Sequence, residues 1–235
     1  MTQPGEVIRA PMRGVFVTGT DTAVGKSVLA AAICAAAVDG LRVAAFKPVV
    51  TGLDEPAGEW PRDHELLAAA ASAGQSPDEV APYCFGPPLS PHLAAELAGE
   101  VVDPGRLVAA AREQAARADV LVCEGVGGLM VPLSGDYLVR DLIGELSLPV
   151  VIAARPGLGT ISHSLLTIEA ARAIALRVQA VVLTPWPAEP SAMERSNRET
   201  IERFAEVAVM GLPPTDPDSL AQAGAGLPVS DWLAP

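Results

Sequence analysis

Lysine and asparagine are nearly missing from this chain of 235 residues. Only two of its 16 basic residues are lysines, Lys26 and Lys47, and its one asparagine is Asn197. A chain with so strong a preference for arginine keeps lysine where a compact ammonium is needed and the planar guanidinium cannot replace it. Lys26 and Lys47 are therefore candidates for chemistry before any motif is considered.

Positive charge is also scarce, because 28 acidic side chains give the chain a formal net charge of −12. This balance argues against sequence-independent binding of nucleic acid, which depends on Lys and Arg side chains that neutralise phosphates. It argues equally against a surface that is attracted to anionic lipid.

Cysteine is too dispersed to build a disulfide framework or a metal site. Cys34, Cys84 and Cys123 are odd in number, far apart, and without a Cys or His ligand spacing, so we expect buried thiols in a reducing compartment. Neither an apolar signal segment nor an apolar run long enough to cross a membrane is present. The sequence predicts a soluble, cytoplasmic protein.

Apolar runs alternate with helical patterns along most of the chain. We expect strands at 14–18, 42–46, 119–123, 150–154 and 180–183 with a weaker one at 207–210, and helices at about 27–38, 63–73, 104–117, 160–175 and 191–207. Continuous apolar strands that alternate with helices indicate a parallel sheet with helices on both faces. We predict a flexible extension at 1–13, a single α/β domain over 14–235 and a mobile loop at 51–62.

A glycine-containing loop lies between the first strand and the first helix, the context that a phosphate-binding loop requires. Its backbone N–H groups and the helix N-terminus would cradle phosphates, Lys26 would reach the β and γ phosphates, and Ser27 would ligate Mg²⁺. Five residues rather than four separate its two glycines. The loop predicts a P-loop NTPase-like fold and these nucleotide-binding residues: Gly19, Thr20, Asp21 (expected to stabilise the turn), Thr22, Ala23, Val24, Gly25, Lys26 and Ser27.

Other candidate residues follow the second and third strands. Lys47 comes directly after the second strand, and Thr51 offers a hydroxyl nearby; ligands bind beyond the carboxyl ends of such strands, so both belong to the edge that carries the phosphate loop. Glu124 ends the third strand, where P-loop ATPases commonly place an acidic group towards Mg²⁺. Gly125 and Gly128 would let the backbone approach a ligand.

Two further features have more than one interpretation. Asp63 begins a helix and is either its N-cap or a second carboxylate for the metal, which would then be held by Ser27, Asp63 and Glu124. The N–H groups of Gly159, Thr160, Ile161 and Ser162 open a helix and suit a substrate carboxylate, but an ordinary turn into a helix has the same pattern.

The motifs together resemble dethiobiotin synthetase. They are VTGTDTAVGKS at 17–27, KPVVTG at 47–52, the Asp63 region, SPH at 90–92, EGVGG at 124–128, PLSGD at 132–136 and LGTISHSLLT at 158–167. Their order and approximate spacing match the family from residue 14 to about 170. The resemblance implies closure of 7,8-diaminononanoate with CO₂ to dethiobiotin, at the expense of ATP and with Mg²⁺, through a carbamate and a carbamic–phosphoric anhydride.

The resemblance also implies roles for single residues. The catalytic residues would be Lys47, which bridges carbamate and γ-phosphate, with Lys26 and Thr22. Thr51 would touch the substrate nitrogens or the carbamate. Ala23 departs from the family, many of whose members have Glu at this position. The family is homodimeric, so the turn at 159–162 would serve the substrate of the neighbouring subunit.

Base recognition departs from the family as well. Many relatives read adenine with an Asn at the end of the fifth strand, where this chain has Thr184, Pro185 and Trp186. A hydroxyl, a proline without an N–H group and a stacking ring give little discrimination. We expect weak base selectivity, so that other nucleoside triphosphates are accepted, with backbone groups of Gly211, Leu212 and Pro213 as further candidates for nucleotide binding.

Asn197 shares a helix face with Met193 and Ile201 and is expected to point inward or towards a cleft. The hypothesis is that it contacts the carboxylate end of the diamine.

Two other functions fit the sequence less well. A cobyrinate-type amide synthase would need a glutamine-hydrolysing domain, for which the chain is too short. A partition-type switch ATPase of related fold usually has a signature lysine early in the phosphate loop, where this chain has Thr20, Asp21 and Thr22.

Overall fold

The computed structural model of the chain describes residues 12–37, 40–56 and 58–234. Most of the extension predicted at 1–13 lies outside these residues, as do Val38 and Asp39, where the first helix was expected to end. Arg13 is described: its guanidinium donates to the carbonyl of Leu233 at 3.2 Å, which ties the start of the domain to its C-terminal segment.

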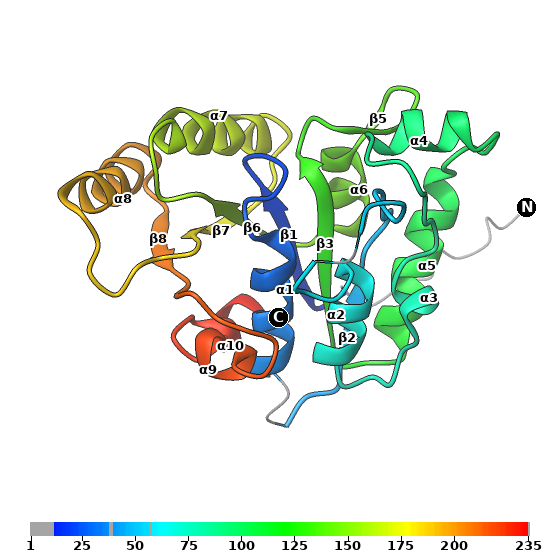
Figure 1. Cartoon of the computed structure of the whole chain (residues 1–235), viewed down its shortest axis with the longest axis horizontal. Helices are drawn as coiled ribbons and strands as arrows, with labels where there is room; N and C mark the ends of the chain where they lie inside the picture. The colour runs from blue at the N-terminus through cyan, green and yellow to red at the C-terminus, as the bar shows by residue number, and fades with distance from the viewer. Residues whose placement is uncertain (1–11, 38–39, 57, 235) are drawn as a thin grey trace, which may run out of the picture.

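Six parallel strands form the central sheet in the order β2-β3-β1-β6-β7-β8 (Figure 1). They are β1 (Gly14–Gly19), β2 (Val43–Phe46), β3 (Val120–Gly128), β6 (Val150–Ala154), β7 (Val178–Leu183) and β8 (Ala208–Gly211). All six were predicted, but β3 does not end at Glu124. It runs to Gly128, which pairs with Gly19 after a shift in register. Only the apolar, fully buried part of this strand is visible as a strand in the sequence.

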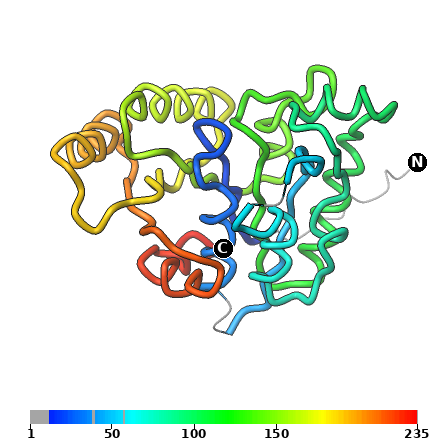
Figure 2. Tube along the Cα trace, in the orientation of Figure 1, coloured from blue at the N-terminus to red at the C-terminus, as the bar shows by residue number. Residues whose placement is uncertain are grey.

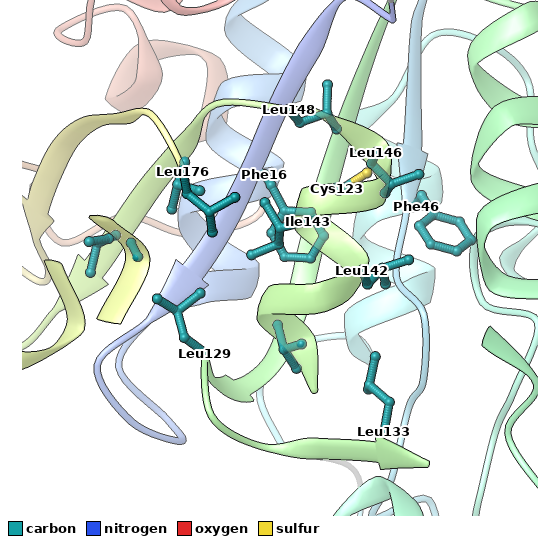
Figure 3. Packing of buried hydrophobic residues seen from close by; sticks show 14 of the residues in the cluster. Phe16, Phe46, Cys123, Leu129, Leu133, Leu142, Ile143, Leu146, Leu148 and Leu176 are labelled. Carbon is teal, nitrogen blue, oxygen red and sulfur yellow. The ribbon is translucent and has the colours of Figure 1, made fainter. Parts of the chain in front are cut away.

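Helices cover both faces of the sheet, as predicted. They are α1 (Lys26–Ala37), α2 (Asp63–Ala70), α3 (Pro77–Val80), α4 (Pro91–Leu97), α5 (Pro104–Ala116), α6 (Val139–Leu146), α7 (Thr160–Arg172), α8 (Ala192–Ala205), α9 (Leu220–Gly224) and α10 (Val229–Trp232). Successive strand residues point to opposite faces and so enter different cores. Val15 and Val17 pack with α1, α2, α9 and α10, whereas Phe16 packs with α5, α6, α7 and α8. Figure 3 shows part of the core that contains Phe16, together with Leu142 and Ile143 of α6.

Several elements were not predicted from the sequence. The segment after β3 forms a hairpin of β4 (Pro132–Ser134) and β5 (Tyr137–Leu138) and then α6. The tail, expected to be irregular, forms α9 and α10, which pack against α1 and lie beside it in Figure 2. The loop expected to be mobile is hydrogen-bonded in the structure, since Arg62 donates to the carbonyls of Gly52 and Leu53 at 3.1 Å each.

Cysteine placement corrects one expectation. All three cysteines are free thiols, and Cys34 and Cys123 are buried as expected, but Cys84 is exposed. Over the ranges that the structure describes, no helix has the length and apolar character needed to cross a membrane.

Candidate active site

The phosphate loop connects β1 to α1 and is stabilised by its own residues. The N–H of Thr22 donates to Asp21 Oδ1 at 2.7 Å, so Asp21 supports the turn, as expected. Gly25 has a φ of +85°, and a Cβ there would lie 2.7 Å from Thr184 Cγ2. Glycine is therefore required at this position both by the backbone conformation and by the close approach of Thr184, which follows β7.

Lys26 is the first residue of α1 and folds back over the loop. Its ammonium donates to the carbonyl of Asp21 at 2.8 Å, and the residue is buried. Burial is the main reason that its pKa falls to about 8, with the neighbouring Lys47 adding to the fall and Glu124 opposing it. An anion bound in the loop would raise the pKa of this ammonium again.

Lys47 joins two carboxylates at the edge of the sheet where the strands end. Its Nζ lies 2.5 Å from Asp63 Oδ2 and 2.7 Å from Glu124 Oε1. Ser27 Oγ lies 2.8 Å from Asp63 Oδ1 and also 2.8 Å from Glu124 Oε1. Asp63 is the first helical residue after the N-cap Arg62, so the N-cap interpretation of Asp63 is wrong and its side chain belongs to the site.

The ionisation of this cluster is set by burial and mutual attraction. Burial opposes the charge of Lys47, but Glu124 and Asp63 outweigh it and hold the pKa of Lys47 above its ordinary value. Burial raises the pKa of Glu124, and Lys47 offsets this only in part. Desolvation also works against the charge of Asp63, yet Lys47 and Ser27 bring the pKa of Asp63 below its usual range. Lys47 and Asp63 therefore carry charge at neutral pH.

A cavity of about 350 Å³ opens over this cluster. It brings together many of the predicted residues: Thr22, Ala23, Gly25, Lys26, Ser27, Lys47, Thr51, Asp63 and Glu124. A second cavity of about 360 Å³ shares Thr22 and Gly127 with the first and continues to Leu166 on α7. Gly19, Thr20, Asp21 and Gly128 line this second cavity. The phosphate loop thus forms a wall of both.

Some predicted glycine and loop residues have packing roles. A Cβ on Gly125 would lie 3.0 Å from the ring of Phe16, so the absence of a side chain there serves the core. Val24 is buried in the core that contains Val15, Val17 and α1. Ala23 is exposed and has a φ of +55°, a conformation that side chains rarely adopt.

The predicted base-binding segments after β7 and β8 lie against each other. The N–H of Trp186 donates to the carbonyl of Leu212 at 2.7 Å, and the N–H of Leu212 donates to the carbonyl of Leu183 at 3.0 Å. A Cβ on Gly211 would lie within 3 Å of the Trp186 side chain. The peptide bond between Thr184 and Pro185 is cis. Because Thr184 also packs on Gly25, the segment after β7 adjoins the phosphate loop.

Some residues at the site were missed, since Val126 and Gly127 line the first cavity and Arg155 contacts the phosphate loop. Arg155 follows β6 directly, and its guanidinium donates to the carbonyl of Thr22 at 3.0 Å. The signal was available, because Arg155 directly follows a parallel strand and so lies at the same edge of the sheet as Lys47.

The turn at 159–162 and Asn197 lie outside both cavities. Gly159 is the N-cap of α7, and no side chain caps this helix. Asn197 is buried, as expected of its helix position, and its Nδ2 donates to the carbonyls of Pro156 at 2.9 Å and Gly157 at 3.2 Å. Both of its donors are committed within the protein, so it has none for the carboxylate that it was expected to bind.

Comparison with solved structures supports the fold. The chain is similar to a ParA family ATPase from Chlorobium tepidum TLS, with a TM-score of 0.55 and 12% identity over 93% of this chain and 92% of that one. It is similar also to apo McdA from Cyanothece, with a TM-score of 0.55 and 10% identity over 94% of this chain and 92% of that one. At this identity the likeness shows a shared α/β fold of the P-loop type and nothing about activity.

Sequence relatives are much closer. A family model described as an AAA domain matches residues 13–223. The chain is 41% identical to the ATP-dependent dethiobiotin synthetase of Anaeromyxobacter dehalogenans over 90% of this chain and 94% of that one. Identity to the enzymes of the same name is 39% in Bacillus licheniformis and 35% in Bacillus subtilis, each over 86% of this chain and 86–87% of the relative. With the phosphate loop and the lysine–carboxylate cluster in place, the chain belongs to the family of ATP-dependent dethiobiotin synthetases.

Proposed function

We propose that the enzyme closes 7,8-diaminononanoate with CO₂ to the cyclic urea dethiobiotin and converts ATP to ADP and phosphate. The observation that carries this proposal is the cluster of Lys26, Lys47, Asp63 and Glu124 on one cavity beside the phosphate loop. The names of the relatives support the product, and the cavity supports a reaction between an anion and a nucleotide phosphate.

The proposed reaction has three steps. One substrate amine takes up CO₂ and loses a proton, which gives a carbamate. A carbamate oxygen then attacks the γ-phosphorus, and the bond to the β-phosphate oxygen breaks to release ADP and leave a carbamic–phosphoric anhydride. The second amine attacks the carbamoyl carbon, loses a proton and expels phosphate as the ring closes.

The second step brings two anions together. At 4 Å, each pair of like charges costs about 4 kcal/mol if the effective dielectric constant is about 20. Lys47 offers a positive charge there that two carboxylates hold in place. Its ammonium has three donors, and the carboxylates of Asp63 and Glu124 use two of them. The third donor is available to a carbamate or γ-phosphate oxygen. Lys26 holds charge on the nucleotide side, and a preorganised charge of this kind stays in place as the transition state forms.

The oxygens of Ser27, Asp63 and Glu124 fit a magnesium ion. Ser27 has a single hydroxyl hydrogen but lies at hydrogen-bond distance from two carboxylates, and Glu124 Oε2 is buried without a partner. Within the described ranges, no three His, Cys, Asp or Glu side chains are grouped to hold a metal. This agrees with Mg²⁺, which uses one or two carboxylates together with substrate phosphates. When bound, the ion would neutralise charge on the β and γ phosphates.

The proposal includes a homodimer whose substrate sites lie at the interface. Leu158, Leu166 and Met130 are 90%, 65% and 53% exposed, and the last two line the second cavity. Large exposed apolar side chains beside a site mark an interaction surface, and the family resemblance favours a second copy as the partner. Sedimentation equilibrium should give two chains per particle, and Leu166→Glu should yield a folded monomer. A monomeric wild-type protein would contradict this part of the proposal.

The activity is tested with diaminononanoate, ¹³C-bicarbonate and MgATP. We expect phosphate release that requires the diamine, and labelled dethiobiotin in equal amount by mass spectrometry. The Lys47→Met variant serves as the control for contaminating enzymes. Phosphate release that continues without the diamine, with no labelled product, would favour the switch ATPase instead. The cytoplasmic location and the domain boundary at residue 14 stay predictions.

A further inference from the structure

Residues 155–159 connect β6 to α7 and therefore link the phosphate loop to the turn at 159–162. At one end, Arg155 donates to Thr22 of the phosphate loop at 3.0 Å. At the other end, Gly159 caps α7 with a φ of +87°. Between them, the carbonyls of Pro156 and Gly157 accept both hydrogen bonds from Asn197 on α8. Within the segment, the N–H of Thr160 donates to the carbonyl of Gly157 at 3.3 Å. Pro156 has no N–H and Gly157 has no side chain, so Asn197 adds side-chain hydrogen bonds that these two residues cannot make themselves.

The helix that carries Asn197 is well anchored. Ser191 and Glu194 form a capping box at its start, and Ile201 is fully buried one turn after Asn197. Asn197 itself is 6% exposed, so its amide is held in a fixed position beneath residues 156–157, away from solvent. The next residue, Arg198, lies over the ring of Trp186 with its guanidinium carbon 5.8 Å from the ring centroid. One helix thus contacts the turn segment and the segment after β7.

We propose that Asn197 is a positioning residue: its amide fixes the backbone of residues 156–157 and thereby aims the N–H groups of Ile161 and Ser162, at the start of α7, at the substrate of the neighbouring subunit. This deepens the proposed function and rests on it. Only a primary amide supplies two adjacent N–H donors at this side-chain length, which gives a reason for the single asparagine of the chain. The phosphate loop depends on Asn197 much less, because Lys26, Asp21 and the bond from Thr20 N–H to the carbonyl of Ala153 hold it independently.

The sharpest variant is Asn197→Asp, which keeps the shape but turns two donors into acceptors that face two carbonyl oxygens. We expect the KM for the diamine to rise about tenfold or more, the size expected from one or two lost hydrogen bonds, with less than about a twofold change in the KM for ATP. Asn197→Ser keeps one donor, so its KM for the diamine should lie between those of Asn197→Asp and the wild type. Ser196→Ala, at an exposed neighbour on α8, is the matched control and should leave both constants unchanged.

A second measurement does not depend on turnover. In Asn197→Ala, amide hydrogen exchange should become faster in peptides that cover 157–162 and stay unchanged in peptides that cover 19–27. The double variant with Arg155→Ala should be less than additive in kcat/KM for the diamine, because both residues hold one segment.

The proposal is overturned if Asn197→Asp changes the constants for the diamine and ATP equally, or changes neither. It is overturned also if exchange at 157–162 is unaffected by Asn197→Ala. If the wild type makes no dethiobiotin while exchange at 157–162 does speed up, the proposed function fails and the structural half of this inference stands. If Asn197→Asp does not fold, the serine variant and the exchange measurement decide.

Discussion

Lys47 and Glu124 form an ion pair that is almost sealed from solvent, with 2.7 Å between Nζ and Oε1 and side-chain exposures of 4% and 0%. Removing two such charges from water costs several kcal/mol per ion before their attraction is counted. A well-packed apolar pair would stabilise the fold at least as well. The pair is therefore explained by what it does for a ligand, since it keeps a positive charge ready at the floor of the cavity.

Replacing Lys47 with arginine tests this role because the charge is retained. The guanidinium is planar and larger than the ammonium, so it cannot occupy the same space between Asp63 and Glu124 or offer a point charge to two anions. We expect the transition state to lose about 3 kcal/mol or more, which corresponds to a fall in kcat of roughly a hundredfold or more. Steady-state kinetics with saturating diamine and ATP measures this fall in kcat, and a thermal melt checks that the variant is folded. An arginine variant that keeps more than about a tenth of the wild-type kcat would refute the role.

The sequence predicted the parts of the site that are local in the chain. The phosphate loop and Lys47 were found because each directly follows an apolar strand, and one edge of a parallel sheet gathers such residues. Thr184 against Gly25 is a contact between distant segments, and no periodicity reports it. The helix α6 was detectable, since Val139, Leu142, Ile143 and Leu146 follow a helical period and are all buried. The end of β3 was not, because glycines after Glu124 signal a loop.

The pKa of Lys26 predicts a pH dependence for nucleotide binding. The protein alone sets this pKa at about 8, and bound phosphates would raise it. Above pH 8 the free protein has lost the proton that the complex keeps, so binding takes up a proton and weakens as the pH rises, by at most about tenfold per pH unit. Below pH 8 both states are protonated and this contribution is flat.

Isothermal titration of ADP at pH 7, 8 and 9 measures this dependence, and buffers of different ionisation enthalpy count the protons taken up. The Lys26→Met variant is the control: it should bind more weakly and lose the change between pH 8 and 9. Equal affinity of the wild type at pH 7 and 9 would contradict the prediction.

Replacing each of two helical glycines with alanine should change the free energy of unfolding in opposite directions. Gly224 ends α9 where it crosses α1, and a Cβ there would collide with the backbone carbonyl of Ala32. Gly224→Ala should lower the free energy of unfolding by about 1–3 kcal/mol through overpacking. Gly144 lies on the exposed side of α6, and nothing lies within 4 Å of the position that its Cβ would take. Gly144→Ala should therefore raise the free energy of unfolding by about 0.5–1 kcal/mol. Urea unfolding of both variants measures the difference. A stability of Gly224→Ala equal to that of wild type would show that α9 does not pack on α1 this closely.

The structure adds a reason to expect weak base selectivity. Around the predicted base site the N–H groups of Thr184, Trp186 and Leu212 already donate to the carbonyls of Ala154, Leu212 and Leu183. Pro185 and Pro213 have no N–H to give. Besides the hydroxyl of Thr184, this segment offers a base the ring of Trp186, which is partly buried and has the guanidinium of Arg198 over it. Stacking on such a ring does not read the edge of a base.

Kinetics with ATP, CTP and GTP at saturating diamine test this expectation. A site that hydrogen-bonds a group rejects analogues by about 10⁴, whereas shape and stacking give about 10-fold to 100-fold, so the three values of kcat/KM should lie within about a hundredfold of one another. Trp186→Ala should raise the KM for all three nucleotides by a similar factor, because it removes only the stacking surface. Lys26→Met, which removes a phosphate contact instead, should weaken all three more strongly. A preference for ATP beyond about 10³-fold would mean that a group outside these two segments reads the adenine edge.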